Sequence, residues 1–246
     1  MGNSLRIDPR TLPGLFAWYA ADSLAGIGAA LPADGTAVAQ WNDISGNGRH
    51  LLQGTGANQP LFKINVAGLN AILPAVRFDG VNDFMTVAGT ALVRPYTLVG
   101  VLKNTLADDN LPHDAGSFNA AVRIGFQVDW LTNNKLTWLD DTTVVNAGPT
   151  ADTTLWHVCT LMAQPTAGPL SRFTVDGVLF TRAGADGTNT DMNIGIGRQN
   201  ASNPFGGDYA EMMLFVGQFQ PCMLDNIRQA LAEKYGLLAS QTLAGQ

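Results

Sequence analysis

Most of the chain before residue 217 consists of short apolar runs, each closed by a turn-forming dipeptide. Alternating apolar and polar positions are typical of a strand with one wet face, and short continuous runs are typical of a fully buried strand. In residues 123–130 every second position is apolar, whereas residues 96–102 are apolar almost throughout. The pattern predicts strands over residues 15–20, 38–43, 75–78, 84–87, 96–102, 123–130, 135–139, 156–162, 171–175, 193–197 and 210–216.

One later run has the spacing of a helix. Its apolar residues recur every three or four positions and so share one face, namely Leu224, Ile227, Leu231 and Tyr235. Pro221 suits the first helical turn, and Gly236 suits the position after the last turn. We therefore predict one amphipathic helix over about residues 221–235, packed either on its own sheet or on a neighbouring subunit.

The dipeptide Asp176-Gly177 lies directly after a predicted strand. Asp-Gly readily adopts the left-handed backbone that a two-residue hairpin loop requires. We expect a hairpin at this point. Taken together, the runs predict an all-β sandwich with one C-terminal helix.

The chain shows no internal repeat and no low-complexity segment, and its 246 residues fit one large β domain. We predict an N-terminal arm over residues 1–14, one β-sandwich over residues 15–238 that includes the helix, and a flexible tail over residues 239–246. The arm either lies on a neighbouring subunit or is a frayed end.

The net charge of −6 comes from scattered acidic residues, and the Lys and Arg residues do not cluster. Nucleic-acid and anionic-membrane partners are therefore disfavoured. No apolar stretch approaches the roughly 18 residues of a membrane span, and the first residues lack the apolar segment of a secretory signal. We expect a chain that is made in the cytoplasm and does not insert into a membrane.

The two cysteines, Cys159 and Cys222, lie in an apolar strand pattern and at the start of the helix pattern. Their spacing is not that of a metal or redox motif. Two buried thiols are favoured over a disulfide.

Catalytic constellations are not evident in the sequence. Glycosidic hydrolysis needs two carboxyl groups that face each other across the bond. The chain has only two glutamates, Glu211 and Glu233. Glu233 lies in the helix pattern beside Lys234, so we expect it not to share a cleft with Glu211. A structural role is favoured for Glu211, and the chain is predicted to have no catalytic residues and no enzymatic activity.

A series of short motifs follows in a characteristic order, from Phe16-x-Trp18 with Ala21-Asp22, through Trp41-x-Asp43-x-Ser45-Gly46, Ala75-Val76-x-Phe78-Asp79-Gly80, Val175-Asp176-Gly177, Ile194-Gly195 and Gly207-x-x-Ala210-Glu211, to Lys234-Tyr235-Gly236. This order resembles a concanavalin A-like lectin/glucanase domain of the laminin-G-like type over about residues 15–236. The resemblance implies a two-sheet antiparallel jelly-roll sandwich. Such domains include lectins, carbohydrate-binding modules, adhesion modules and glycoside hydrolases, so the fold alone does not decide the function.

Domains of the type that the chain resembles often hold a Ca²⁺ ion at a loop rim. Oxygen donors lie near predicted turns at Asp43, Asn47, Asp79 and Asp83. Asp and Asn are also the usual turn residues, because their side chains bond to their own backbone. No ligand set and no cofactor are therefore predicted, and Ca²⁺ remains an alternative.

Sugar recognition calls for an aromatic platform beside amide or carboxylate groups. Phe118 and Phe205 lie in loop-like context and are the predicted ligand-binding residues, whereas Trp130 and Trp138 are assigned to the core. The long segment 104–119 is expected to carry contacts, because long loops on a rigid sandwich often do.

These observations lead to a prediction of a non-enzymatic virion surface protein: a capsid decoration, head fibre or tail protein made in the host cytoplasm. Its expected partners are other virion proteins or copies of itself, together with a cell-surface glycan. The alternative is a carbohydrate-binding or adhesion module of a secreted bacterial protein, located outside the cell. A glycoside hydrolase is the third hypothesis.

Overall fold

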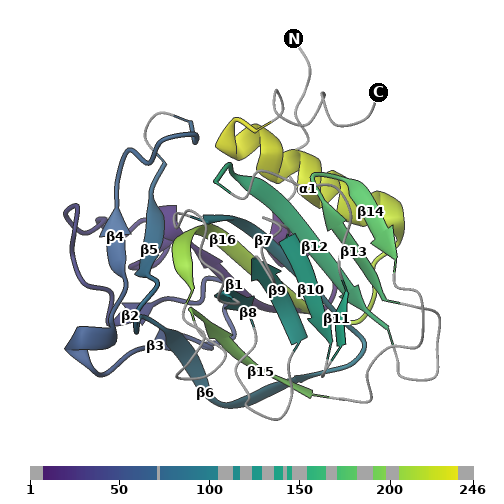
Figure 1. The fold of residues 1–246 in the computed structure, drawn as a ribbon, viewed down its shortest axis with the longest axis horizontal. Coiled ribbons are helices and arrows are strands. Elements are labelled where there is room, and N and C mark those ends of the chain that lie inside the picture. Colours follow the sequence, from purple (N-terminus) through teal and green to yellow (C-terminus); the bar gives the residue numbers. More distant parts are fainter. Residues whose placement is uncertain are drawn as a thin grey trace.

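The structure is a computed structural model that describes residues 8–70, 73–104, 113–116, 124–128, 136–140, 143–145, 154–164, 171–181, 191–197 and 205–237. Its strands form antiparallel sheets, and one helix lies near the C-terminal end (Figure 1). The predicted all-β architecture with a C-terminal helix is confirmed. Among the described residues, no helix is long and apolar enough to cross a membrane.

The main sheet has eight strands in the order β14-β13-β12-β7-β16-β5-β4, with β1 also paired to β16. Strand β16 is central: β7 pairs along one edge, while β5 and β1 share the other edge. The bounds are β1 Leu15–Ala20, β4 Leu61–Lys63, β5 Ala75–Asp79, β7 Tyr96–Asn104, β12 His157–Ala163, β13 Arg172–Val175, β14 Val178–Thr181 and β16 Gly206–Val216.

Two four-stranded sheets accompany the main sheet. One has the order β15-β6-β3-β2 and the other β11-β10-β9-β8. Their strands are β2 Gln40–Trp41, β3 Leu51–Leu52, β6 Met85–Val93, β8 His113–Gly116, β9 Ile124–Val128, β10 Leu136–Asp140, β11 Thr143–Val145 and β15 Asp191–Ile196. Three short 3₁₀ helices also occur: η1 Pro9–Thr11, η2 Ala21–Ser23 and η3 Gly56–Asn58.

Both faces of the main sheet are buried. Leu51, Met85 and Ile196 of the β15-β6-β3-β2 sheet join side chains of the main sheet in one apolar cluster. A second cluster, which includes Val99, Val158 and the buried side chains of the helix, lies on the opposite face. A strand that is buried on both faces reads as a continuous apolar run, which is the pattern seen at residues 96–102.

The helix α1 Pro221–Tyr235 packs on the main sheet of its own chain. The four apolar residues that predicted it are buried, and Pro221 occupies its first turn. The backbone N–H of Gly236, at φ 76°, bonds to Ala232 and Glu233 carbonyls, and that of Leu237 bonds to Ala232. This left-handed cap ends the helix where the sequence predicts.

Local predictions had mixed outcomes. The hairpin is confirmed, because β13 and β14 pair across Asp176-Gly177 with Val175 opposite Val178. Cys159 is buried, but Cys222 is exposed on α1, so the expectation of two buried thiols is wrong for Cys222. The buried apolar residues of α1 pack on the sheet, and Cys222 lies on the exposed side of the helix.

Candidate functional site

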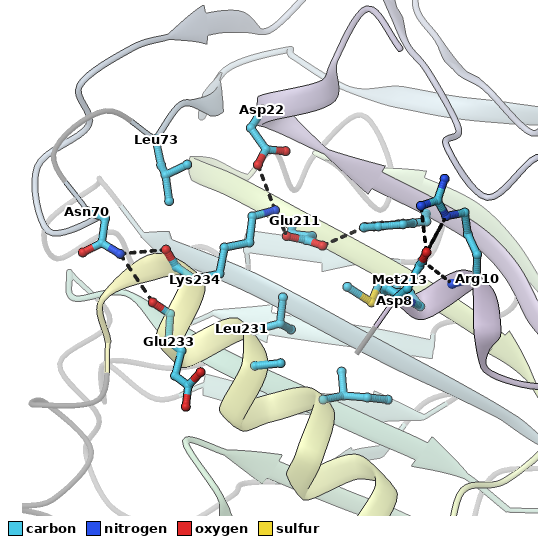
Figure 2. Close-up of a pocket in the computed structure, with 14 residues that line it drawn as sticks. Asp8, Arg10, Asp22, Asn70, Leu73, Glu211, Met213, Leu231, Glu233 and Lys234 are labelled. Atoms are coloured by element: carbon cyan, nitrogen blue, oxygen red, sulfur yellow. Dashed lines mark hydrogen bonds and ion pairs between the residues drawn. The ribbon is translucent and has the colours of Figure 1, made fainter. Parts of the chain in front are cut away.

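A cavity of about 810 Å³ lies where α1 meets η1, η2 and the strands β1 and β16 (Figure 2). Its wall combines charged groups, an indole and aliphatic side chains, namely Asp8, Pro9, Arg10, Trp18, Asp22, Asn70, Leu73, Glu211, Met213, Ile227, Ala230, Leu231, Glu233 and Lys234. The cavity therefore offers both apolar surface and hydrogen-bonding groups.

A β-bulge in β16 turns Glu211 toward this cavity. The register with β7 shifts between Tyr209, which pairs with Leu102, and Glu211, which pairs with Val101. Tyr209 points into the cluster between the sheets, whereas Ala210 belongs to the helix-side cluster. Because a bulge places two successive residues on one face, Glu211 lies on the helix side together with Ala210.

Three donors hold the Glu211 carboxylate, which is only 1% exposed. Trp18 Nε1 donates to Oε1 at 2.7 Å, while Lys234 Nζ and the Tyr235 hydroxyl donate to Oε2 at 2.6 and 2.7 Å. A buried carboxylate is costly unless it is paired and hydrogen-bonded, and here both conditions are met. These contacts are those of a structural anchor between β1, β16 and α1.

Lys234 bridges two carboxylates. Its Nζ lies 3.0 Å from Asp22 and 2.6 Å from Glu211, and Figure 2 shows the side chain reaching between them. Burial alone would lower the pKa of this ammonium, but the two carboxylates outweigh it, so the pKa of Lys234 is raised. Lys234 therefore carries a positive charge in the cavity wall.

Tyr235 stays a neutral phenol. Burial, followed by the charges of Glu211 and Asp22, raises the pKa of its hydroxyl well above the ordinary value. The same hydroxyl donates to Glu211 and lies 3.2 Å from the Ala210 carbonyl. The phenol thus ties both residues of the bulge to the last turn of the helix.

Asn70 fixes the end of α1 beside the cavity. Its Nδ2 donates to the Lys234 carbonyl at 2.7 Å, and its backbone N–H donates to the Tyr235 carbonyl at 3.0 Å. These bonds satisfy carbonyls that have no partner within a helix. A Cβ at Gly236 would lie 2.3 Å from Asn70 Oδ1. Glycine is therefore required there both by this close contact and by the left-handed backbone.

The opposite rim carries an ion pair between Asp8 and Arg10. Arg10 Nε and Nη2 donate to the Asp8 carboxylate at 2.9 and 2.7 Å, and Asp8 also accepts from the Arg10 backbone N–H. Both side chains are exposed, and such pairs contribute little to stability. They do supply hydrogen-bonding groups at the edge of the cavity.

Two predictions about acidic residues meet different outcomes. The structural role expected for Glu211 agrees with its contacts. The expectation that Glu233 would not share a cleft with Glu211 is wrong, because both line the cavity. The last turn of α1 lies over the bulge of β16, and this brings residues together that are 22 positions apart in the chain.

The predicted aromatic platform is also wrong for Phe205. Its side chain is fully buried, and its ring lies 5.9 Å from that of Phe78 and 5.5 Å from that of Tyr209. The ring fills the core and has no face for a ligand. Phe118 and Trp130 lie outside the described residues, as do the side chain of Trp138 and most of segment 104–119.

Trp18 is the aromatic residue that sequence reasoning missed. It lies in β1 between Ala17 and Tyr19, which are both fully buried in the cluster between the sheets. Strict alternation therefore points Trp18 to the other face, where it is half-buried in the cavity wall. This alternation is the feature of the sequence that could have identified Trp18.

Two of the residues considered for Ca²⁺, Asp43 and Asp79, accept hydrogen bonds from backbone N–H groups. Asp43 accepts from the backbone N–H groups of Trp18, Ser45 and Arg49. Asp79 accepts from those of Val81 and Asn82. Within the part of the chain that the structure describes, no group of three or more His, Cys, Asp or Glu residues could hold a metal ion.

Comparison by sequence gave no match, either to models of known protein families or to characterised proteins. Comparison of structures gave several. Domain 4 of AbnA, a GH43 extracellular arabinanase from Geobacillus stearothermophilus, in complex with arabinotriose, is 14% identical with a TM-score of 0.57, and the match covers 88% of this chain and 98% of that domain. An arabinofuranosidase in complex with arabinofuranosyl-xylobiose is 15% identical with a TM-score of 0.62, over 81% of this chain and 51% of the other.

A Trypanosoma rangeli sialidase in complex with sialic acid is 14% identical with a TM-score of 0.55, over 89% of this chain. The chain spans about a third of that sialidase, as the match covers 33% of it. At such identities the likeness shows the fold alone. The fold is that of β-rich domains found in carbohydrate-active enzymes.

Two functional predictions are contradicted by these likenesses. The expected virion surface protein finds no support, because the similar folds come from a sialidase, an arabinanase and an arabinofuranosidase. The prediction that the chain is not an enzyme is contradicted on the same ground. The first prediction rested on the lack of a secretory signal and the second on the small number of glutamates, and neither observation describes a binding site.

Proposed function

We propose that this chain is a carbohydrate-recognising domain, and that a short oligosaccharide binds in the cavity against Trp18. One observation carries the proposal: the half-buried indole lies in the same cavity as the charged and amide side chains of Asp22, Asn70 and Arg10. An aromatic face packs on the apolar side of a sugar ring, while such polar groups bond to its hydroxyls.

The size and composition of the cavity agree with this proposal. Small-molecule sites usually measure about 300–1,000 Å³, and this cavity measures about 810 Å³. Its apolar residues Met213, Ile227 and Leu231 come from the sheet and the helix, so the site is built on rigid elements. The buried bonds of Glu211 hold Trp18 and Lys234 in place before any ligand arrives.

The similarity to Domain 4 of AbnA adds support, because nearly the whole of that domain is matched and it was solved with arabinotriose. We extend the proposal to the finer fold type, a concanavalin A-like jelly roll of the laminin-G-like kind. We also propose an extracellular location, where polymeric glycans are met.

The test is titration calorimetry of the chain with arabinotriose and xylobiose, using a variant that fills the cavity. Ala230 lines the cavity from α1 and takes part in none of the bonds around Glu211. We expect Ala230→Trp to abolish binding. Gln229→Trp is the matched control, since residue 229 is exposed on the same helix and does not line the cavity. Equal binding by both variants would place the ligand elsewhere.

One observation favours a second candidate, hydrolysis of a glycosidic bond. The Asp22 and Glu211 oxygens lie 3.0 and 2.6 Å from the same Lys234 nitrogen, so they are less than about 6 Å apart, and retaining glycosidases hold their two carboxyl groups about 5–5.5 Å apart. We rank this candidate second because the Glu211 carboxylate is buried and accepts from three donors. Release of reducing sugar that is lost in Asp22→Asn would establish it.

A further inference from the structure

Acidic side chains outnumber basic ones among the described residues that line the cavity. Of the described residues in its wall, four carry carboxylates (Asp8, Asp22, Glu211 and Glu233) and two carry cations (Arg10 and Lys234). These six side chains together carry a formal charge of −2. We propose that the cavity selects uncharged sugars and rejects sugars that carry a carboxylate, such as sialic or uronic acids. This inference rests on the proposed function and names the ligand class of the same site.

Both cations among the described wall residues are already paired with carboxylates. Lys234 is held between Asp22 and Glu211 at 3.0 and 2.6 Å, and its side chain is largely buried. Arg10 faces Asp8, with Nε 2.9 and 3.1 Å from the two carboxylate oxygens and Nη2 2.7 Å from one of them. A carboxylated sugar would thus meet paired cations and excess negative charge.

Uncharged sugars are not repelled by the carboxylates of the wall. A sugar hydroxyl can donate to the Asp22 carboxylate without bringing a charge of its own into the cavity. Electrostatic complementarity acts mainly on specificity, because a like charge opposed in an interface costs more than a matched pair contributes. A wall with excess carboxylates therefore separates neutral from acidic glycans more strongly than it separates one neutral glycan from another.

The test measures affinity by calorimetry for three neutral probes (arabinotriose, xylobiose and lactose) and two acidic probes (sialyllactose and trigalacturonate). We expect the best neutral probe to bind at least about tenfold more tightly than either acidic probe at low salt. Added salt should reduce this ratio, because it screens the repulsion of the acidic probes. Lactose and sialyllactose form a matched pair that differs by one charged residue.

A charge reversal at the rim provides the second measurement. Glu233→Lys, on the exposed last turn of α1, should reduce the neutral-to-acidic ratio several-fold. Asp225→Lys is the control, because it makes the same change in net charge on the same helix at a residue that does not line the cavity. A ratio that falls equally in both variants would contradict a local effect of the cavity wall.

The outcomes separate this inference from the proposed function. An acidic probe that binds as tightly as the best neutral probe overturns the selectivity and leaves carbohydrate recognition standing. If none of the probes binds, carbohydrate recognition is itself overturned, together with the selectivity that depends on it. Neutral binding with a ratio that Glu233→Lys reduces and Asp225→Lys leaves unchanged supports both.

Discussion

The indole of Trp18 in β1 donates a hydrogen bond to Oε1 of Glu211 in β16 at 2.7 Å, although 193 residues separate them in the chain. The two strands pair directly, with Ala20 opposite Glu211 and Trp18 opposite Met213. The same carboxylate accepts from Lys234 and Tyr235 of α1. One buried carboxylate thus links the first strand, the central strand and the helix around the cavity.

Removing the indole N–H should destabilise the fold. In Trp18→Phe an aromatic side chain remains, although it is smaller than the indole, and Oε1 of Glu211 loses its donor at a site that is 1% exposed. An unsatisfied buried acceptor costs about 1–3 kcal/mol, and more when it is charged. We expect the free energy of unfolding, measured by urea denaturation, to fall by about 2 kcal/mol.

Trp156→Phe is the matched control for this change. Its Nε1 donates to the neutral Ala67 carbonyl at 3.0 Å, so the same atoms are removed beside an uncharged acceptor. Hydrogen bonds to charged groups contribute more than neutral ones. Trp156 is 4% exposed, whereas Trp18 is half-buried, so Trp156→Phe loses more packing. A larger loss in Trp18→Phe than in Trp156→Phe would therefore support the bond to Glu211, and a loss well below about 1 kcal/mol in Trp18→Phe would contradict it.

The features that were predicted correctly from the sequence depend on local chemistry. Pro221 and Gly236 bound the helix, and Asp176-Gly177 makes the hairpin with φ values of 50° and 87°. The geometry of turns and helix caps depends on a few neighbouring residues, so the local sequence is enough to predict it. The alternation of strand residues likewise fixes which side chains share a face.

The site could not be predicted from the sequence, because it depends on the register of paired strands and on contacts between residues far apart in the chain. The bulge that turns Glu211 toward α1 is defined by pairing with β7, which no pattern within β16 reveals. Phe205 lies in a glycine-rich stretch that suggests a loop, yet its ring packs between Phe78 and Tyr209 from two different strands. Contacts between strands far apart in sequence leave little trace in local composition.

Loss of the bridging ammonium should be costly as well. Lys234→Met keeps the aliphatic stem but leaves two carboxylates, Asp22 and Glu211, close together without their cation. Breaking a buried ion pair on one side costs about 3–5 kcal/mol, and the 29% exposure of Lys234 lowers our expectation to about 2–3 kcal/mol. Urea denaturation provides the measurement.

Two further variants define the Lys234 effect. Lys63→Met removes the partner of Asp34 in an exposed pair and should cost less than about 1 kcal/mol. The double variant Lys234→Met with Glu211→Gln removes the uncompensated charge along with its partner and should recover part of the loss. No recovery in the double variant would argue against electrostatic coupling between these two residues.

Gly236, in the C-terminal cap of α1, combines a left-handed backbone with a close contact to Asn70. Gly236→Ala places a methyl group 2.3 Å from Asn70 Oδ1 at a residue with φ 76°. Gly217→Ala, at φ 95°, meets the same kind of backbone strain but no atom within 4 Å. We expect Gly236→Ala to lower the melting temperature further than Gly217→Ala, because it also displaces the Asn70 cap. Equal shifts would mean that Asn70 yields without cost.

Asp83, in the turn that follows β5, should make stability depend on pH. Burial, and then the charge of Asp79, raises the pKa of its carboxyl to about 6, against 3.8 when unperturbed. Between these two values the folded chain binds more protons than the unfolded chain, so this group makes the protein less stable as pH rises from about 4 to 6.

Replacing Asp83 should remove that dependence. Asp83→Asn cannot ionise and keeps an oxygen that can accept from the Asp79 backbone N–H, as Oδ2 does at 3.0 Å. At pH 7 the variant should be more stable than the parent by about 1–3 kcal/mol, and at pH 4 the difference should vanish. Urea denaturation at both pH values checks this. A variant that is destabilised equally at pH 4 and pH 7 would show that the carboxylate is needed for its bonds and that burial does not penalise its charge.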